Sequence, residues 1–172
     1  MGHRRPIPIE LQKNDFAPLD VIVDDAIRRI DELRRTIVIA INGSSIDVGK
    51  SAVSGALNRK LTEKGIPVGI ASDIGTCRIA VEQLEFSRRM LSSSTPGILL
   101  LQAAAQGASA SSFKKLDTLV ALYNHSLQEL CGVAGIDLWI GIQRPDRPFS
   151  YKHPVADYLI QNTGATDKGR WK

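Results

Sequence analysis

The sequence predicts an α/β fold, a three-layer α/β/α sandwich on a mainly parallel sheet of five strands. Residues 36–41 form an almost uninterrupted β-branched, apolar run, typical of a strand covered on both faces. A helical pattern begins soon afterwards at Val48, and short apolar runs then alternate with helical patterns. This alternation is characteristic of a parallel sheet with helical crossovers, in which ligands bind at the carboxyl ends of the strands.

The first 18 residues are predicted to form an extended N-terminal arm. They contain Pro6, Pro8 and Pro18, and proline lacks the N–H that regular secondary structure uses. Residues 19–172 are then expected to form a single domain. The whole chain has 172 residues, of which 43% are hydrophobic, enough for one core.

The next segment is predicted to be a helix that runs to about residue 35, with Asp20 as its N-cap. Acidic residues precede basic ones by four positions, an arrangement that favours the helix. These pairs are Asp24 with Arg28 and Asp25 with Arg29.

The helix that begins near Val48 is expected to end at Gly65, with Val53, Leu57 and Leu61 on its apolar face. Beyond it, apolar runs predict the remaining strands, and spacings of three and four predict the remaining helices. Strands are predicted over residues 66–72, 97–102, 136–142 and 157–161, and helices over residues 76–91 and 113–130.

Residues 43–51 read Gly-Ser-Ser-Ile-Asp-Val-Gly-Lys-Ser between the predicted strand and helix, the layout of a phosphate-binding loop, or Walker A motif. Backbone N–H groups of such a loop and of the following helix cradle phosphates. Lys50 is predicted to reach the terminal phosphates and Ser51 to bind magnesium, which makes ATP and Mg2+ the expected cofactors. The predicted nucleotide-binding residues are Gly43, Ser44, Ser45, Ile46, Asp47, Val48, Gly49, Lys50 and Ser51.

The spacing of this loop departs from the usual motif. Five residues separate Gly43 from Gly49, where the usual motif has four. Either the loop is one residue longer, or Ser44 occupies the first-glycine position, whose conformation glycine adopts more easily. The alternatives are a degenerate loop that binds phosphate weakly or not at all, and a strand–turn–helix that contains Gly-Lys-Ser by chance.

Three further positions bear on phosphoryl transfer. Asp73 follows the second strand, where it is predicted to orient the acceptor or hold the metal; a turn or helix-cap aspartate is the alternative. Arg144 and Arg147 lie in a basic loop, predicted to act as a mobile lid that stabilises the transferring phosphate; the alternative is a solvated loop. Gln102 ends the third strand, where a carboxylate usually organises magnesium, and it argues against an efficient enzyme. The predicted catalytic residues are Lys50, Asp73, Arg144 and Arg147, and the predicted metal ligands are Ser51 and Asp73.

Composition narrows the class of partner. The net charge is +4, small and scattered, so we expect a small-molecule phosphoryl acceptor and no nucleic acid. No apolar run reaches 18 residues, which predicts no membrane span. Cys77 and Cys131 lie far apart and are predicted to be reduced, as in a cytoplasmic protein; a reactive role for Cys77, near the predicted site, is the alternative.

Three segments resemble the P-loop small-molecule kinases, especially the uridine-kinase-like group and dephospho-coenzyme A kinase. Residues 39–51 resemble their phosphate loop, and residues 64–73 their following strand, whose aspartate, here Asp73, lies near the phosphoryl acceptor. Residues 153–164, with the pattern Ala-Asp-Tyr-x-Ile-x-Asn-x-Gly, resemble their closing strand. The resemblance implies a P-loop NTPase fold and a kinase that moves the γ-phosphate of ATP to a nucleoside-like or other hydroxyl or phosphate acceptor.

The loop also resembles that of dethiobiotin synthetase and the cobyric acid synthase group, in its five-residue spacing and in Val48 just before Gly49. This second resemblance implies an ATP-dependent ligase with a carboxylate-bearing substrate and a homodimer. The lysine-bearing second strand and the glycine-rich segment of those enzymes are not evident in this sequence. A third interpretation is a non-catalytic module that keeps the fold, which Gln102 supports.

Overall fold

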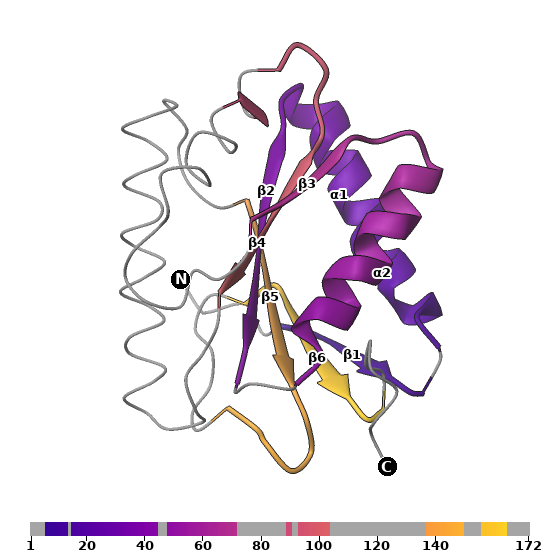
Figure 1. Ribbon diagram of the computed structural model, residues 1–172, viewed down its shortest axis with the longest axis vertical. Coiled ribbons are helices and arrows are strands. Elements are labelled where there is room, and N and C mark those ends of the chain that lie inside the picture. The colour runs from indigo at the N-terminus through magenta and orange to yellow at the C-terminus, as the bar shows by residue number, and fades with distance from the viewer. Residues whose placement is uncertain are drawn as a thin grey trace.

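The computed structural model describes residues 6–13, 15–44, 48–71, 89–90, 93–103, 137–149 and 156–164. Their strands and helices follow one another along the chain as shown in Figure 1. The elements are β1 (Ile7–Leu11), the 3-10 helix η1 (Ala17–Leu19), α1 (Asp20–Leu33), β2 (Ile37–Gly43), α2 (Lys50–Glu63), β3 (Val68–Ala71), β4 (Ile98–Ala103), β5 (Leu138–Gln143) and β6 (Tyr158–Asn162).

The described strands form one six-stranded sheet in the order β1-β6-β5-β2-β4-β3, and every neighbouring pair is parallel. The predicted α/β class with a mainly parallel sheet is therefore confirmed. Each of the five predicted strands is present, with its ends displaced by one or two residues. The predicted number of strands is wrong, because β1 adds a sixth.

Strand β1 corrects the prediction of an extended N-terminal arm. It pairs with β6 from Ile7 opposite Tyr158 to Leu11 opposite Asn162. The N–H of Ile7 donates to the carbonyl of Asp157, and the carbonyl of Leu11 accepts from the N–H of Thr163, so both residues face β6. Because the backbone groups of successive residues face opposite sides of a strand, those of Pro8 face outward. Proline is tolerated on the outer side of an edge strand because no ladder bond needs its missing N–H. Pro8 is therefore compatible with an edge strand.

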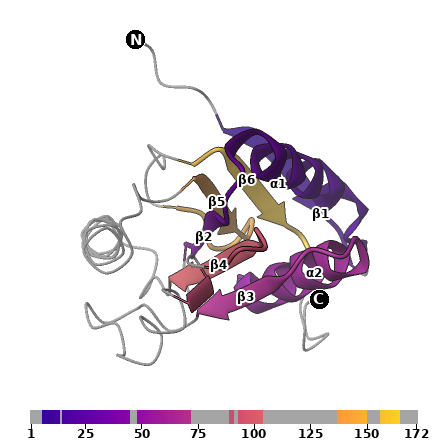
Figure 2. The same cartoon turned by 90° about the horizontal axis from the view of Figure 1, so that it is seen from above.

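Both described helices cover the same face of the sheet (Figure 2). The crossovers from β1 to β2 and from β2 to β3 run in the same direction across the sheet. Right-handed crossovers in one direction place their helices on one face, which accounts for the arrangement. The second helical layer of the predicted sandwich would come from the helices predicted over residues 76–91 and 113–130, which lie almost entirely outside the described residues.

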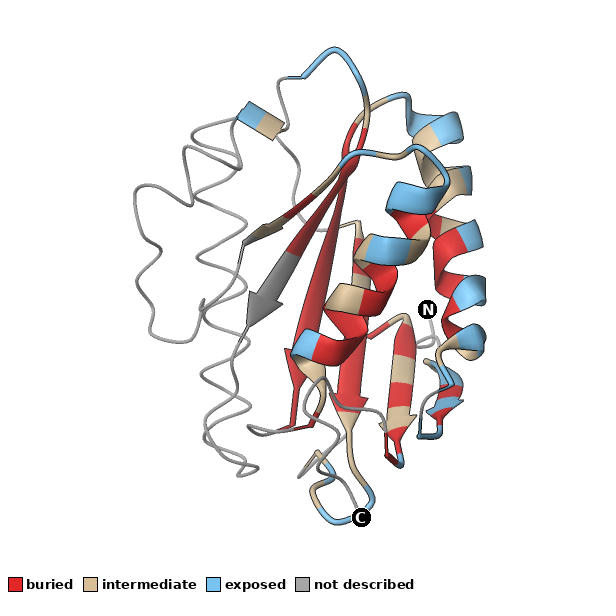
Figure 3. Cartoon of the chain, turned by 45° about the vertical axis from the view of Figure 1, so that its right-hand side comes forward, coloured by how far each residue is buried: buried red, intermediate tan, exposed pale blue. Residues whose placement is uncertain are grey.

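The core lies between this face of the sheet and the two helices (Figure 3). Every residue of β2 is buried, as expected of a central strand covered on both sides. Helix α2 buries Val53, Leu57 and Leu61 against it, which confirms the predicted apolar face. Gly65 follows the helix with a φ of 80°, a conformation that suits glycine.

The start of α1 differs from the prediction. Asp20 is the first residue of the helix, and no side-chain hydrogen bond caps it, because η1 leads directly into α1 and Leu19 takes the cap position. The carboxylate of Asp20 instead contacts the ammonium of Lys60 at 2.7 Å, joining α1 to α2. No helix within the described ranges is long and apolar enough to cross a membrane.

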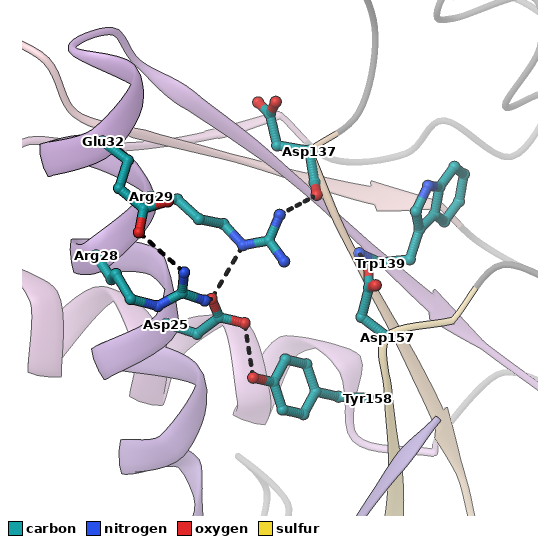
Figure 4. A network of polar contacts seen from close by, with 8 residues as sticks. All are labelled: Asp25, Arg28, Arg29, Glu32, Asp137, Trp139, Asp157 and Tyr158. Carbon is teal, nitrogen blue, oxygen red and sulfur yellow. Dashed lines mark hydrogen bonds and ion pairs between the residues drawn. The ribbon is translucent and has the colours of Figure 1, made fainter. Parts of the chain in front are cut away.

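A polar network at the amino ends of the strands joins α1 to β5 and β6 (Figure 4). The hydroxyl of Tyr158 donates to Asp25 at 2.7 Å, and Nε of Arg29 donates to the same carboxylate at 3.0 Å. Arg29 also donates to the backbone carbonyl of Asp137 at 3.0 Å. The predicted pairing of Asp25 with Arg29 is thus confirmed, while Arg28 pairs with Asp25 and Glu32.

These contacts change the pKa of Asp25. Burial raises this pKa. The hydrogen bonds from Tyr158 and Arg29 and the positive charges of Arg29 and Arg28 lower it by more than burial raises it, so the pKa lies below the ordinary 3.8. The pKa of Tyr158 is raised, first by burial and then by its bond to Asp25.

We expect Asp25→Asn to lower the free energy of unfolding at pH 7 by about 1–2 kcal/mol, since it removes a charged acceptor. A carboxyl with a lowered native pKa stabilises the fold above its unfolded pKa and loses that contribution as the pH falls through the native value. The difference between the two proteins should therefore shrink as the pH falls below about 4. Urea denaturation at pH 7, 5, 4 and 2.5 measures it, and a difference that is unchanged at pH 2.5 would contradict the assignment.

Candidate functional site

The carboxyl ends of β2 and β5 form a switch point in the sheet (Figure 1). From β2 the chain continues to β3 on one side, and from β5 it continues to β6 on the other, while β2 and β5 are neighbours. Such switch points open a crevice at the carboxyl edge, where ligands of open α/β sheets bind. The predicted phosphate loop follows β2 and the predicted arginine loop follows β5, so both begin at this edge of the sheet.

Gly43 is the last residue of β2, and no larger residue fits there. A Cβ at this position would lie 2.6 Å from Cγ2 of Val48 and 2.9 Å from Cδ of Lys50. The side chains of Val48 and Lys50 therefore fold back over the end of β2, where only a glycine leaves room for them. This is the close-approach glycine of the loop.

The two interpretations of the loop spacing differ in what they require of Ser44. Among the described residues other than glycine, only Arg34 has a positive φ, so Ser44 does not take up the left-handed conformation. Gly43 has no positive φ either, so it is the close approach at Gly43 that favours the longer loop, with Gly43 as its first glycine and five residues before Gly49.

Gly49 sets the direction of helix α2. Its φ is 102°, a left-handed value that glycine adopts without strain, and its carbonyl accepts the first helical bond, from Val53, at 2.9 Å. No side chain caps the helix, which begins at Lys50. The backbone N–H groups of its first turn, with the positive end of the helix dipole, suit an anion. Lys50 is partly buried there, and Ser51 is exposed beside it.

Ser44 ties the start of the loop to β5 and to the turn that follows it. The residue is buried, its N–H donates to the carbonyl of Ile142 at 3.0 Å, and its hydroxyl donates to the carbonyl of Arg147. These bonds hold the start of the predicted phosphate loop against β5 and the turn after it.

The two arginines of the predicted lid lie in a tight turn. The N–H of Arg147 donates to the carbonyl of Arg144 at 3.0 Å, closing residues 144–147. Arg144 contacts the carboxylate of Asp146 at 2.9 Å. The turn is also held at its end, because the N–H of Phe149 donates to the side chain of Gln143 at 2.9 Å. The hydrogen bond from Ser44 to Arg147 places this turn beside the start of the loop. Both arginines therefore lie at the carboxyl edge of the sheet.

Asn162 is a site residue to which the sequence pattern alone assigned no role. Its side chain is fully buried at the end of β6, and its Nδ2 donates to the carbonyl of Val48 at 2.9 Å. One signal in the sequence points to it: the buried positions of β6 are Tyr158, Ile160 and Asn162, so an amide occupies a position that alternation assigns to the core.

The structure therefore brings together the described part of the predicted site. At one edge of the sheet lie the described residues of the loop and of the start of α2, which are Gly43, Ser44, Val48, Gly49, Lys50 and Ser51. The adjacent turn carries Arg144 and Arg147. Ser45, Ile46, Asp47 and Asp73 lie outside the described residues. Gln102 is in β4, paired with Ile41 of β2.

A magnesium ion would find part of its coordination here. Within the described ranges, no three His, Cys, Asp or Glu side chains gather as a metal-binding group. Mg2+ takes oxygen ligands and relies on one or two protein groups together with phosphate oxygens and water. The predicted ligands are the hydroxyl of Ser51, in the first turn of α2, and the carboxylate of Asp73.

A groove of about 520 Å3 lies at the opposite, amino edge of the sheet, beside the network of Figure 4. It is lined by α1 and by the starts of β1 and β6. Asp25 there is paired with Arg28, Arg29 and Tyr158, so the network already satisfies its charge. We therefore place the candidate site at the carboxyl edge.

The described strands and helices define an α/β protein with a parallel sheet, and open sheets of this kind generally bind their ligands at the carboxyl edge. Neither protein-family models nor curated protein sequences match this chain.

Proposed function

We propose that the protein binds ATP with Mg2+ and transfers the γ-phosphate to a hydroxyl or phosphate group of a small molecule, as a cytoplasmic kinase. The observation that carries the proposal is the close approach at Gly43, where a Cβ would lie 2.9 Å from Cδ of Lys50. A lysine that folds back over the end of the central strand, at the start of an uncapped helix, is suited to hold phosphate oxygens.

Each residue has a role in this proposal. Lys50 and the backbone amides around Gly49 bind the phosphates, and the hydroxyl of Ser51 holds Mg2+, which would offset the charge of the phosphate oxygens. Asp73 accepts the proton of the acceptor hydroxyl. The oxygen of that hydroxyl forms a bond to the γ-phosphorus while the bond from the γ-phosphorus to the β–γ bridging oxygen breaks. Arg144 and Arg147, held beside the loop, offset charge on the transferring group.

The loop geometry also favours a second candidate, an ATP-dependent ligase that activates a carboxylate. With Gly43 as the close-approach residue, five residues precede Gly49, which is the spacing that resembles dethiobiotin synthetase. A ligase would consume ATP only with a carboxylate-bearing substrate, whereas a kinase requires a hydroxyl or phosphate acceptor.

Mg-ATP is expected to stabilise the protein and to lose this effect in Lys50→Ala. A ligand at about 100 times its dissociation constant adds about 2.7 kcal/mol. Thermal unfolding with Mg-ATP, with Mg-GTP and with ATP without metal measures the shift and its dependence on magnesium. The matched control is Lys60→Ala in the same helix, whose ammonium contacts Asp20 away from the loop.

The outcomes separate the interpretations. A magnesium-dependent shift that is lost in Lys50→Ala and kept in Lys60→Ala supports the site, and ADP release with hydroxyl, phosphate or carboxylate acceptors then distinguishes kinase from ligase. An absence of any shift in the native chain would contradict both and favour a module that has kept the fold without the activity.

A further inference from the structure

The buried amide of Asn162 links the last strand of the sheet to the phosphate loop. Its side chain has no solvent exposure, and it bonds to a carbonyl 114 residues away. Burying an amide is unfavourable unless it is hydrogen-bonded. The buried side chain of Asn162 therefore favours the loop position that places the carbonyl of Val48 within reach.

The orientation of this amide is held from the other side. Oδ1 of Asn162 accepts the N–H of Gly164 at 3.3 Å, which leaves Nδ2 facing Val48. The segment that supplies this N–H is fixed to β1, because Thr163 donates to the carbonyl of Leu11 through its N–H at 2.8 Å and through its hydroxyl at 2.6 Å. Strand β1 therefore supports the amide that reaches the loop.

The bond to Val48 has a consequence for Gly49. The peptide between these two residues is planar and trans, so its C=O and N–H point in opposite directions. Asn162 draws the carbonyl of Val48 toward the buried end of β6. The N–H of Gly49 must then point away from Asn162. Val48 itself is fully buried, and Gly49 adopts the left-handed conformation that turns the chain into α2.

We propose that Asn162 is a positioning residue for phosphate binding: its amide sets the orientation of the Val48–Gly49 peptide so that the N–H of Gly49 faces the bound phosphate. This inference rests on the proposed function of the loop and adds a residue from β6 to it. Without the amide, the carbonyl of Val48 is left buried without this donor, and rotation of the peptide turns the Gly49 N–H away from the ligand.

The test uses inorganic pyrophosphate, which occupies a phosphate loop without needing an acceptor or a base. In Asn162→Leu, of similar size, we expect the affinity for pyrophosphate to fall about tenfold, the effect of about one hydrogen bond. The amide resonance of Gly49, which we expect to shift on titration of the native chain with pyrophosphate, should no longer do so. A purely structural role for Asn162 would change stability and leave both measurements as they are.

The matched control is Tyr158→Phe, on the same strand at the opposite edge of the sheet, which removes the bond to Asp25 and touches no loop residue. It should lose stability while it keeps pyrophosphate affinity and the Gly49 shift. A second variant, Gly164→Ala, covers the case in which Asn162→Leu does not fold. A Cβ there would lie 3.2 Å from the backbone of Lys13 and displace the N–H that orients Asn162, so we expect a smaller loss of affinity.

Native affinity in a folded Asn162→Leu, or in Gly164→Ala if Asn162→Leu does not fold, would overturn the inference and leave the proposed function standing. Failure of the native chain to bind pyrophosphate or Mg-ATP would overturn both.

Discussion

Replacing Gly43 with alanine is expected to destabilise the protein by about 1–3 kcal/mol and to weaken nucleotide binding strongly. The added methyl would lie 2.6 Å from Cγ2 of Val48, which is fully buried. It would also lie 2.9 Å from Cδ of Lys50 and push away the side chain predicted to hold the phosphates. Urea denaturation measures the first effect, and a Mg-ATP titration measures the second.

The same substitution at Gly55 is the control. This glycine lies in α2, and among the described residues a Cβ there would meet Nη1 of Arg59 alone, at an ordinary 3.6 Å. Alanine is favoured over glycine inside a helix by about 0.5–1 kcal/mol, so Gly55→Ala should stabilise the protein and leave binding unchanged. Equal effects of the two variants would show that the end of β2 is not the close approach inferred from its geometry.

Asp137→Ala is expected to lower the free energy of unfolding by about 2–4 kcal/mol. The carboxylate accepts bonds from both terminal nitrogens of Arg35 at 2.9 and 2.7 Å, and from the buried N–H of Val38 at 2.9 Å. It joins the start of β5 to the start of β2, and its hydrogen bond with Arg35 raises the pKa of that guanidinium. Since Arg35 is 41% exposed, most of the loss comes from the N–H of Val38, left without its acceptor.

Chemical denaturation at pH 7 measures this loss, and Asp20→Ala provides the comparison. Asp20 also pairs with a basic residue, Lys60, but its side chain is 64% exposed and holds no buried N–H. Exposed pairs contribute up to about 1 kcal/mol, so Asp20→Ala should have a small effect. A loss at Asp137 no larger than that at Asp20 would contradict the role given to Val38.

The elements of the central sheet could be predicted because their patterns are local. Residues 37–41 and 98–101 are continuous apolar runs, and both lie in strands whose described side chains are buried. The apolar face of α2 followed from its period of 3.6 residues. The role of the last strand could not be predicted in this way. It depends on Asn162, a polar residue in a core position, whose hydrogen-bond partner Val48 is distant in the sequence.

The N-terminal strand could not be predicted from local pattern. Pro8 argues against a strand unless its outward side is known to be the edge of the sheet, and only the pairing of Ile7 with Tyr158 supplies that knowledge. The position of the arginine turn beside the loop depends on a distant contact in the same way. Its bond to Ser44 spans 103 residues and is not visible in either segment alone.

The sequence by itself determined the α/β class, the described elements from α1 to β6, and the place of the predicted phosphate loop, since these depend on neighbouring residues and on hydrophobic period. Only the tertiary structure decided the order of strands in the sheet, the role of Gly43 in place of Ser44, and the contacts from Ser44 and Asn162 that hold the loop. These depend on which backbones approach closely and which buried polar groups find partners, and both are decided when distant segments pack together.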